Sequence, residues 1–391
     1  MKIALLGFGT VGSGVYEIIN SNSTSFLIPI NIKKILVKNI SDYFFDIMTT
    51  DIDEIINDPE IELVVEAIGG INPAYEYITK SLKNKKHVVT SNKAVVALYL
   101  DEFLELAKKN NVQFKFEASV CGGIPWIKSL YETKKIDNIY KVSGIFNGTT
   151  NFILDNMKNK ETDFLETLKI AQNLGYAESD PSADIDGIDI LRKLQITLNI
   201  AFNSNIYPED IDIFGIRNIS KTDIEYFRKI NSTIKLIATG KRHDNLFYAN
   251  IEPVAFKNEK MEAIIPNNFN LGSIFGDTIG ELKFYGQGAG KLPTGNAVVR
   301  DILDILFKKN YLLTEINKKN YLKKDSSLSK GKYYIRIQNE EFKLKYSQII
   351  AESFQFNNEN IFITQTIESN YINLISKEYS NDNLFYVKIE N

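Results

Sequence analysis

Cysteine and histidine are almost absent from this 391-residue sequence, which contains one cysteine and two histidines. A single cysteine excludes an intrachain disulfide and a cysteine-based zinc site, and two histidines argue against a multi-histidine metal site. No apolar run approaches the roughly 18 residues of a membrane-spanning helix. The net charge of −3 gives no basic field for nucleic acid or an anionic membrane. We therefore expect a protein of a reducing cytoplasm without nucleic-acid or membrane partners.

The composition is that of a folded chain with more than one domain. Hydrophobic residues make up 44% and charged residues 24% of the sequence. The opening MKIALLGFG runs straight into a strand pattern, so we expect no signal peptide. Lysine pairs such as Lys33–Lys34 and Lys85–Lys86 are interpreted as solvated edges.

Two patterns of secondary structure follow one another along the chain. Residues 1–120 alternate short apolar runs with helical stretches, which predicts βαβ units and a doubly wound parallel sheet. Beyond residue 130, half-exposed strand patterns alternate with helices expected near 163–174, 186–202 and 222–231. This second pattern predicts an α+β domain.

A glycine-rich loop, Gly7-x-Gly9-x-x-Gly12, follows the first strand pattern and opens a helix. The first glycine permits a tight turn, the second lets backbone approach a pyrophosphate, and the third lets helix and strand pack closely. The helix N-terminus offers N–H groups to phosphates. The pattern predicts a dinucleotide site in a Rossmann-type domain; a turn needed only for packing is the alternative. The predicted contacts are Gly7, Phe8, Gly9, Thr10, Val11 and Gly12.

The end of the second predicted strand bears on the choice of nicotinamide cofactor. An acid at this point binds the ribose 2′-hydroxyl of NAD and repels a 2′-phosphate. Lys38 and Asn39 stand there instead. Lys38 can pair with a phosphate, which favours NADP, while NAD remains possible. The alternative is that Lys38 is an ordinary surface residue.

Six ordered motifs resemble the homoserine dehydrogenase family over about residues 1–310. They are GFGTVGSGV (7–15), VTSNKAVVA (89–97), FEASVCGGIPWI (116–127), GIFNGTTNFIL (144–154), GYAESDPSADIDGIDILRK (175–193) and GQGAGKLPTGNAVVRDI (286–302). The resemblance implies NAD(P)-dependent interconversion of L-homoserine and L-aspartate 4-semialdehyde, a step of threonine and methionine biosynthesis. It also implies a homo-oligomer, a dimer or a tetramer.

An acid-rich stretch supplies the main catalytic hypothesis. Asp189 and Lys193 are four residues apart on a predicted helix, so their side chains share one face and can pair. A plain ion pair on a solvated helix would have the same spacing. The resemblance implies that Lys193 is the proton donor and that Asp189 contacts the substrate. It assigns Glu178 to the substrate amino group, with Asp184 as a further candidate.

Lys93 follows the C-terminal end of a predicted parallel strand, where open α/β sheets bind their ligands. It resembles a family lysine close to nicotinamide and substrate. Lys93 or Lys193 could stabilise the developing alkoxide, and the sequence does not divide these roles. The remaining acids Asp180, Asp186 and Glu166 are interpreted as capping or solvated residues.

The loop EASVCGGIP resembles a family loop that holds a monovalent cation, usually sodium. The resemblance implies ligands at Glu117, Val120, Gly122 and Ile124. It also places Gly69, Gly175 and Gly290 near the cofactor. Cys121 is interpreted as a small packed residue. Thr149 and Thr150, at a predicted helix start, fit a helix N-cap as well as a substrate contact.

These observations predict an α/β chain in four regions. They are a Rossmann-type nucleotide-binding domain (1–129, rejoined by 286–310), an α+β catalytic and dimerisation domain (130–285), a polar linker (311–331) and a C-terminal segment (332–391). The last begins with YYIRI like an ACT domain but lacks the usual acid–glycine turn, so we expect a degenerate ACT-like βαβ unit. Two other functions stay open: another NAD(P)-dependent oxidoreductase of amino-acid-derived carbonyls, or a non-catalytic nucleotide sensor.

Overall fold

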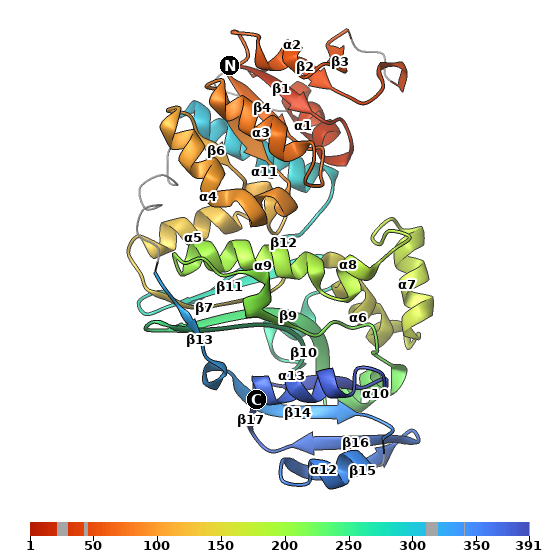
Figure 1. Cartoon of the computed structure of the whole chain (residues 1–391). Coiled ribbons are helices and arrows are strands. Elements are labelled where there is room, and N and C mark those ends of the chain that lie inside the picture. The colour runs from red at the N-terminus through yellow and green to blue at the C-terminus, as the bar shows by residue number, and fades with distance from the viewer. Residues whose placement is uncertain (22–29, 43–45, 310–319, 340, 391) are drawn as a thin grey trace. The chain divides into compact units, whose positions relative to one another are not determined.

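The structure is a computed structural model that describes residues 1–21, 30–42, 46–309, 320–339 and 341–390 (Figure 1). The chain divides into two compact units. Unit 1 comprises Met1–Ile136 and Gly286–Lys319, and unit 2 comprises Asp137–Tyr285 and Asn320–Asn391. Over the described ranges, no helix has the length and apolar composition to cross a membrane.

Unit 1 is built on a six-stranded sheet in the order β3-β2-β1-β4-β5-β6. Every neighbouring pair in it is parallel, which confirms the predicted doubly wound sheet. Residues 3–6 are fully buried because helices cover both faces of such a sheet. The strands are β1 (Lys2–Leu6), β2 (Asn31–Leu36), β3 (Met48–Thr49), β4 (Leu63–Glu66), β5 (His87–Thr90) and β6 (Phe114–Lys115).

The helices of unit 1 come from both of its chain segments. They are α1 (Thr10–Asn20), α2 (Asp53–Ile56), α3 (Ala74–Lys83), α4 (Lys93–Lys109), α5 (Trp126–Lys134) and α11 (Lys291–Leu306). The glycines Gly14 and Gly295 let α1 and α11 pack backbone to backbone. A Cβ added at Gly295 would lie 2.9 Å from the Gly14 carbonyl carbon.

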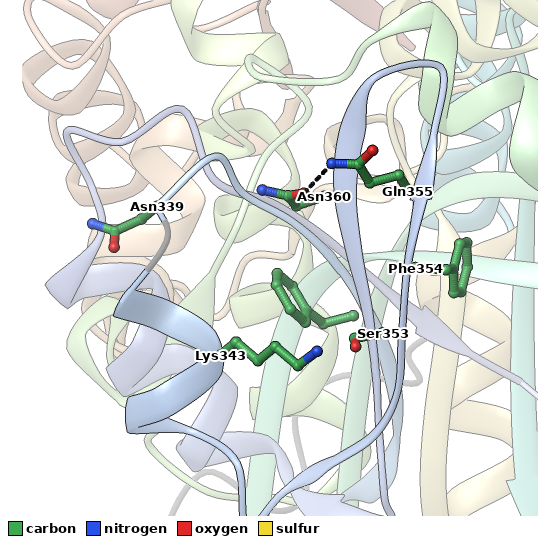
Figure 2. A pocket seen from close by; sticks show the side chains of 7 residues that line it. Asn339, Lys343, Ser353, Phe354, Gln355 and Asn360 are labelled. Carbon is green, nitrogen blue, oxygen red and sulfur yellow. Dashed lines mark hydrogen bonds between the residues drawn. The ribbon is translucent and has the colours of Figure 1, made fainter.

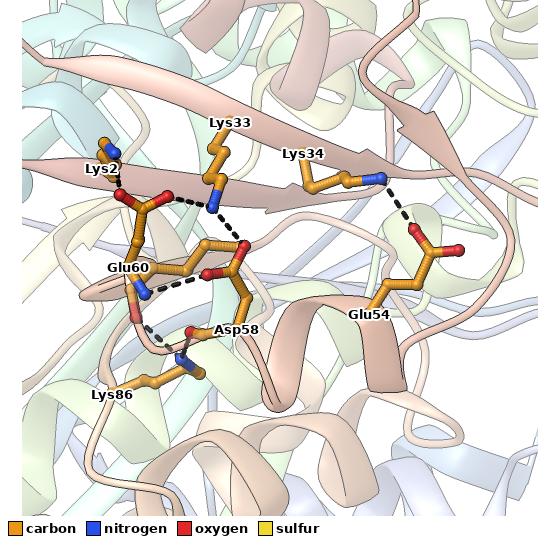
Figure 3. A network of polar contacts seen from close by, with 8 residues as sticks. Lys2, Lys33, Lys34, Glu54, Asp58, Glu60 and Lys86 are labelled. Carbon is orange, nitrogen blue, oxygen red and sulfur yellow. Dashed lines mark hydrogen bonds and ion pairs between the residues drawn. The ribbon is translucent and has the colours of Figure 1, made fainter.

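A charged network lies at the N-terminal ends of β1 and β2, opposite the end of the sheet that carries the glycine loop (Figure 3). Lys33 pairs with Asp58 at 2.6 Å and Lys34 with Glu54 at 2.7 Å. Lys86 was predicted to be solvated, and this is wrong. It is buried, and its Nζ donates to the carbonyls of Asp58 and Ile61 at 2.7 and 2.8 Å. This network joins β1 and β2 to α2 and to the segment before β4, away from the nucleotide loop.

Unit 2 contains a mixed 12-stranded sheet whose main path is β12-β11-β7-β9-β10-β18-β14-β16-β15. Its first strands are β7 (Ile139–Ile145), β8 (Ile211–Ile213), β9 (Ser232–His243), β10 (Leu246–Lys257), β11 (Phe269–Gly276) and β12 (Gly280–Gln287). β10 pairs with β9 in antiparallel register and with β8 in parallel. The predicted α+β character is therefore confirmed.

Three helices of unit 2, α7, α9 and α10, agree with the positions predicted near 163–174, 186–202 and 222–231. All the helices of this unit in the described residues are α6 (Gly148–Lys160), α7 (Phe164–Asn173), α8 (Ser182–Ile185), α9 (Ile188–Ala201), α10 (Lys221–Lys229), α12 (Glu341–Lys345) and α13 (Ser369–Glu378). α6, α9 and α10 all pack against β9, the long central strand. In Figure 1 the green α9 runs along the sheet near α8 and α6.

The C-terminal segment continues the sheet of unit 2. Its strands are β14 (Lys330–Arg336), β15 (Ile350–Phe356), β16 (Glu359–Thr364), β17 (Ile367–Glu368) and β18 (Phe385–Ile389). β18 pairs in parallel with β10 and antiparallel with β14. Part of the predicted linker, 311–319, lies outside the described residues, and the rest contains β13 (Lys323–Lys324) and a 3-10 turn. The ACT-like assignment stays a prediction.

Candidate active site

Lys193 and Asp189 form a buried pair on α9. Their exposed fractions are 9% and 6%, and Lys193 Nζ lies 2.7 Å from Asp189 Oδ2. The same Nζ donates to the Phe146 carbonyl oxygen at 2.7 Å. The pair is therefore not the solvated helix pair that the spacing also allowed. Two of the three N–H donors of the ammonium point at these acceptors, and the third can donate to a substrate oxygen.

Asn147 joins this pair to Asp184, and the sequence reasoning missed it. Its Nδ2 donates to Asp184 Oδ1 at 2.7 Å and to Asp189 Oδ2 at 2.9 Å. Its Oδ1 caps α6 by accepting the Thr150 N–H at 2.8 Å. Burial raises the pKa of Asp184, and the hydrogen bond from Asn147 opposes this shift. Four polar side chains from α6, α8 and α9 thus form one cluster.

Thr149 and Thr150 are not the cap of α6, since Asn147 holds that position. The Thr149 hydroxyl donates to the Tyr176 carbonyl at 2.6 Å and so ties the start of α6 to the acid-rich loop. The only available sequence signal for Asn147 was its place just before a helical stretch, where asparagine is a favoured cap.

Glu178 lies outside the cluster in this structure. Its side chain is exposed, and its backbone carbonyl accepts from Gln172 Nε2 at 3.0 Å. Asp180 accepts the Ser182 N–H at 3.1 Å, and Asp186 pairs with Arg217 at 2.6 Å. Asp180 is an exposed capping residue, as interpreted, whereas Asp186 is half-buried in an ion pair with Arg217. Glu166 lies in the first turn of α7.

The glycine loop of unit 1 has the backbone geometry that its motif predicts. Gly7 has φ +99°, and a Cβ there would lie 2.7 Å from the Ala67 carbonyl oxygen. A Cβ at Gly12 would lie 2.1 Å from the Gly7 carbonyl oxygen, so helix and strand approach as closely as expected. Gly9 precedes α1, and within the described chain no side chain caps this helix start. Its N–H groups can bind a pyrophosphate.

Glu66 organises the loop beside these glycines and was also missed. This fully buried carboxylate at the end of β4 accepts from the Thr90 hydroxyl at 2.5 Å. It also accepts the N–H groups of Ile68 and Gly69 at 2.9 and 3.2 Å. Gly69 has φ +82°, a conformation that favours glycine. Glu66 thereby holds the turn that passes next to Gly7.

The other predicted residues of unit 1 lie at element ends. Lys93 is half-buried at the first position of α4, whose cap Asn92 accepts the Ala94 N–H at 3.1 Å. Lys38 is exposed just after β2. Gly290 precedes α11 with φ +124°. Gly175, with φ +74°, belongs to unit 2 and is exposed.

The predicted cation loop surrounds a buried acid. Glu117 is 4% exposed, and its carboxylate accepts the N–H groups of Ile127 and Lys128 at 3.0 and 2.8 Å. Burial and the neighbouring Asp301 carboxylate raise its pKa to about 8. Cys121 is buried, which agrees with a packed residue. In the parts of the chain described, no group of three or more His, Cys, Asp or Glu could hold a metal ion.

A separate pocket of about 360 Å³ lies in the C-terminal segment (Figure 2). Lys343 of α12 faces it, together with Ser353 of β15 and Asn360 and Phe362 of β16. Its described lining contains amides, a hydroxyl and one ammonium but no carboxylate. It therefore lacks an acid for a substrate ammonium and does not compete with the cluster around Lys193.

The fold and the glycine loop define an NAD(P)-dependent oxidoreductase, and comparisons with known proteins agree. Residues 7–117 match the family model "Homoserine dehydrogenase, NAD binding domain", and residues 125–303 match "Homoserine dehydrogenase". A Bacillus subtilis homoserine dehydrogenase is 38% identical over 78% of this chain and 73% of its own length. The one from Helicobacter pylori is 38% identical over 90% and 85%. The chain belongs to the homoserine dehydrogenase family.

Solved structures extend the similarity to the whole chain. A homoserine dehydrogenase from Thiobacillus denitrificans has a TM-score of 0.88 and 30% identity, covering 100% of this chain and 98% of that one. A hyperthermophilic archaeal homoserine dehydrogenase in complex with NADPH has a TM-score of 0.68 and 27% identity. This match covers 79% of this chain and 98% of the archaeal chain.

Proposed function

We propose that this enzyme interconverts L-homoserine and L-aspartate 4-semialdehyde, with NADP(H) as cofactor. The buried Lys193–Asp189 pair, joined to Asp184 by Asn147, is the observation that carries this proposal. When bound, the nicotinamide supplies or accepts the hydride at the substrate carbon. The cluster provides the two other requirements of the reaction, a proton donor and an anchor for a cationic amino group.

Lys193 is the proposed proton donor to the substrate oxygen during aldehyde reduction. Asp189 and the Phe146 carbonyl direct its ammonium. Asp184, Asp189 and Glu178 are the proposed carboxylates for the substrate ammonium. Lys93, half-buried at the start of α4, is proposed to contact nicotinamide and substrate.

The proposed cofactor contacts lie in the glycine loop, with Gly69, Lys93, Gly175 and Gly290 as further contacts. The space beside Gly9 is open, because an added Cβ there would meet nothing within 4 Å. This supports close contact between the backbone and a pyrophosphate. Lys38, exposed beyond β2, supports a preference for NADP. The NADPH complex of the archaeal relative points the same way.

A monovalent cation, sodium, is proposed at Glu117 and the carbonyls of Val120, Gly122 and Ile124. The residues fit a cation because Glu117 is buried near Asp301, and the charge of that carboxylate raises the pKa of Glu117. A bound cation would offset this repulsion. Carboxylate and carbonyl oxygens are the ligands that hard cations prefer.

A homo-oligomer, a dimer or a tetramer, is also proposed. The support for this proposal is the membership of the chain in the homoserine dehydrogenase family. Light scattering coupled to size exclusion tests this, and a monomer at micromolar concentration would contradict it.

The activity is tested by following NADPH consumption with L-aspartate 4-semialdehyde. We expect turnover with NADPH and slower turnover with NADH. No turnover with either cofactor would overturn the proposal. NADPH binding without turnover would instead favour a nucleotide sensor, and turnover only of another amino-acid aldehyde would favour a different oxidoreductase.

A further inference from the structure

Asn147 makes three hydrogen bonds that have different consequences. Its Oδ1 accepts the Thr150 N–H at 2.8 Å, which caps α6. Its Nδ2 donates to Asp184 Oδ1 at 2.7 Å and to Asp189 Oδ2 at 2.9 Å. The side chain is 4% exposed, so solvent does not replace these contacts easily. A carboxamide has one acceptor and two N–H donors, and all of them are in use.

The cap alone does not require an asparagine. Serine and aspartate cap helices about as well, and Asp163 caps α7 by accepting the Glu166 N–H at 2.8 Å. Only a carboxamide can cap α6 and also place one N–H on each of two carboxylates. An asparagine therefore supplies the hydrogen bonds that both acids accept and also caps the helix.

The two acids need such a donor because they are buried next to each other. A carboxylate removed from water without hydrogen bonds favours its protonated form, and a neighbouring carboxylate adds to that effect. Asp189 Oδ2 receives both Asn147 Nδ2 and Lys193 Nζ, so the orientation of this carboxylate also directs the lysine. A protonated Asp184 could share its proton with Asp189 and weaken the hold on Lys193.

We propose that Asn147 is a positioning residue that holds the Asp184 and Asp189 carboxylates in place, and thereby aims Lys193 at the substrate oxygen. This inference rests on the proposed function, since it assumes that Lys193 and the two acids serve the reaction. Asn147 itself touches neither the substrate nor the cofactor in this role. Its effect passes through hydrogen bonds to the acids.

The charges around Asp184 set the expected pH response. Burial raises the pKa of Asp184, and Asp189 raises it further, whereas the Asn147 hydrogen bond and Lys193 lower it. Thr149 of α6 also lowers it. Removing the Asn147 donor therefore moves the pKa of Asp184 upward. If the ionised acid is needed, the acidic limb of the pH–activity profile moves to higher pH.

The test compares Asn147→Ser with wild type in full pH profiles of kcat and kcat/KM for the reduction of L-aspartate 4-semialdehyde, the direction in which Lys193 donates the proton. Serine keeps the cap acceptor but cannot supply both amide N–H groups. We expect kcat/KM to fall about 10- to 100-fold, the loss typical of a hydrogen bond to a charged group. The acidic limb should move to higher pH, and KM for NADPH should stay unchanged. Asp163→Ser, a cap exchange on α7, is the matched control, and it should change neither kcat/KM nor the position of the acidic limb.

Asn147→Asp provides a second variant with the cap retained. It adds a third carboxylate, so the loss of activity and the shift of the acidic limb should both exceed those of the serine variant. Activity within twofold of wild type in both variants would overturn the inference. The inference would also be overturned if activity fell only in proportion to the loss of folded enzyme while the acidic limb of the pH profile stayed in place. A wild-type enzyme without turnover would overturn the proposed function and this inference with it.

Discussion

Lys193 is the single residue whose replacement should reduce activity most. Lys193→Met keeps much of the side-chain volume but removes the proton, so we expect kcat to fall about 10²- to 10⁴-fold. Asp189 would also lose an ammonium 2.7 Å away. Steady-state assays at saturating substrate measure the effect. Lys80→Met is the control, because Lys80 forms an exposed i,i+4 pair with Glu76 at 2.9 Å. Near wild-type turnover of Lys193→Met would contradict the proton-donor role.

Lys38 should affect the choice of cofactor rather than the chemistry. Lys38→Ala removes an exposed charge beyond β2, so the ratio of kcat/KM for NADPH to that for NADH should fall about fivefold. Competing assays with the two cofactors give this ratio directly. Lys34→Ala, on β2 itself, is the control, since Lys34 pairs with Glu54. An unchanged ratio in Lys38→Ala would remove Lys38 from the 2′-phosphate site.

The predicted residues and the missed residues differ in the sequence separation of the contacts they make. The spacing of Asp189 and Lys193 is local, so a helix pattern suffices to predict their pairing. Asn147 contacts Asp184 and Asp189 across 37 and 42 residues, and Glu66 contacts Thr90 across 24. Such contacts depend on how helices and strands pack, which no local pattern contains.

At the scale of elements, the start of α5 and the loop before it depend on the Glu117 carboxylate. Both of its oxygens accept backbone N–H groups of α5, so this acid also caps the helix. If sodium binds here, sodium chloride should raise the Tm more than choline chloride at equal ionic strength. The reason is that a bound cation stabilises only the folded state. Differential scanning fluorimetry measures the difference.

Two variants separate a specific cation effect from general salt screening. Glu117→Gln should lose the difference between sodium and choline, because it removes the carboxylate that is proposed to bind the cation. Asp304→Asn should keep it, since Asp304 pairs with Lys128 at 3.1 Å and is not a proposed ligand. Equal Tm values in the two salts for the wild type would argue against the cation.

At the scale of the whole chain, the sheet of unit 2 includes strands far apart in sequence. β18 pairs with β10 through Val254 with Lys388 and Ala255 with Ile389. The sequence patterns predicted strands in this region and the change from a parallel sheet to an α+β domain. They could not predict this pairing, because strand periodicity specifies a face and not a partner. The C-terminal segment therefore looked separable, whereas it belongs to the same compact unit.

A buried ion pair links the C-terminal segment to α10. Arg336 Nε lies 2.9 Å from Asp223 Oδ1, and Arg336 Nη2 donates to the Asn218 carbonyl at 2.6 Å. The Tyr334 hydroxyl donates to the same Asp223 oxygen at 2.8 Å. The Arg336 and Asp223 side chains are 3% and 0% exposed. Removing one partner would leave the other charge buried, which typically costs about 3–5 kcal/mol.

Arg336→Met should therefore destabilise unit 2 by about 3–5 kcal/mol, measured by urea denaturation. Trp126, the one tryptophan of the chain, lies in unit 1, so its fluorescence follows unit 1 while far-UV circular dichroism follows both units. We expect the dichroism transition to begin at lower urea while the fluorescence transition stays in place. Adding Asp223→Asn should recover part of the loss, because no buried charge then lacks a partner. An unchanged dichroism transition in Arg336→Met would mean that the C-terminal strands contribute little to the stability of unit 2.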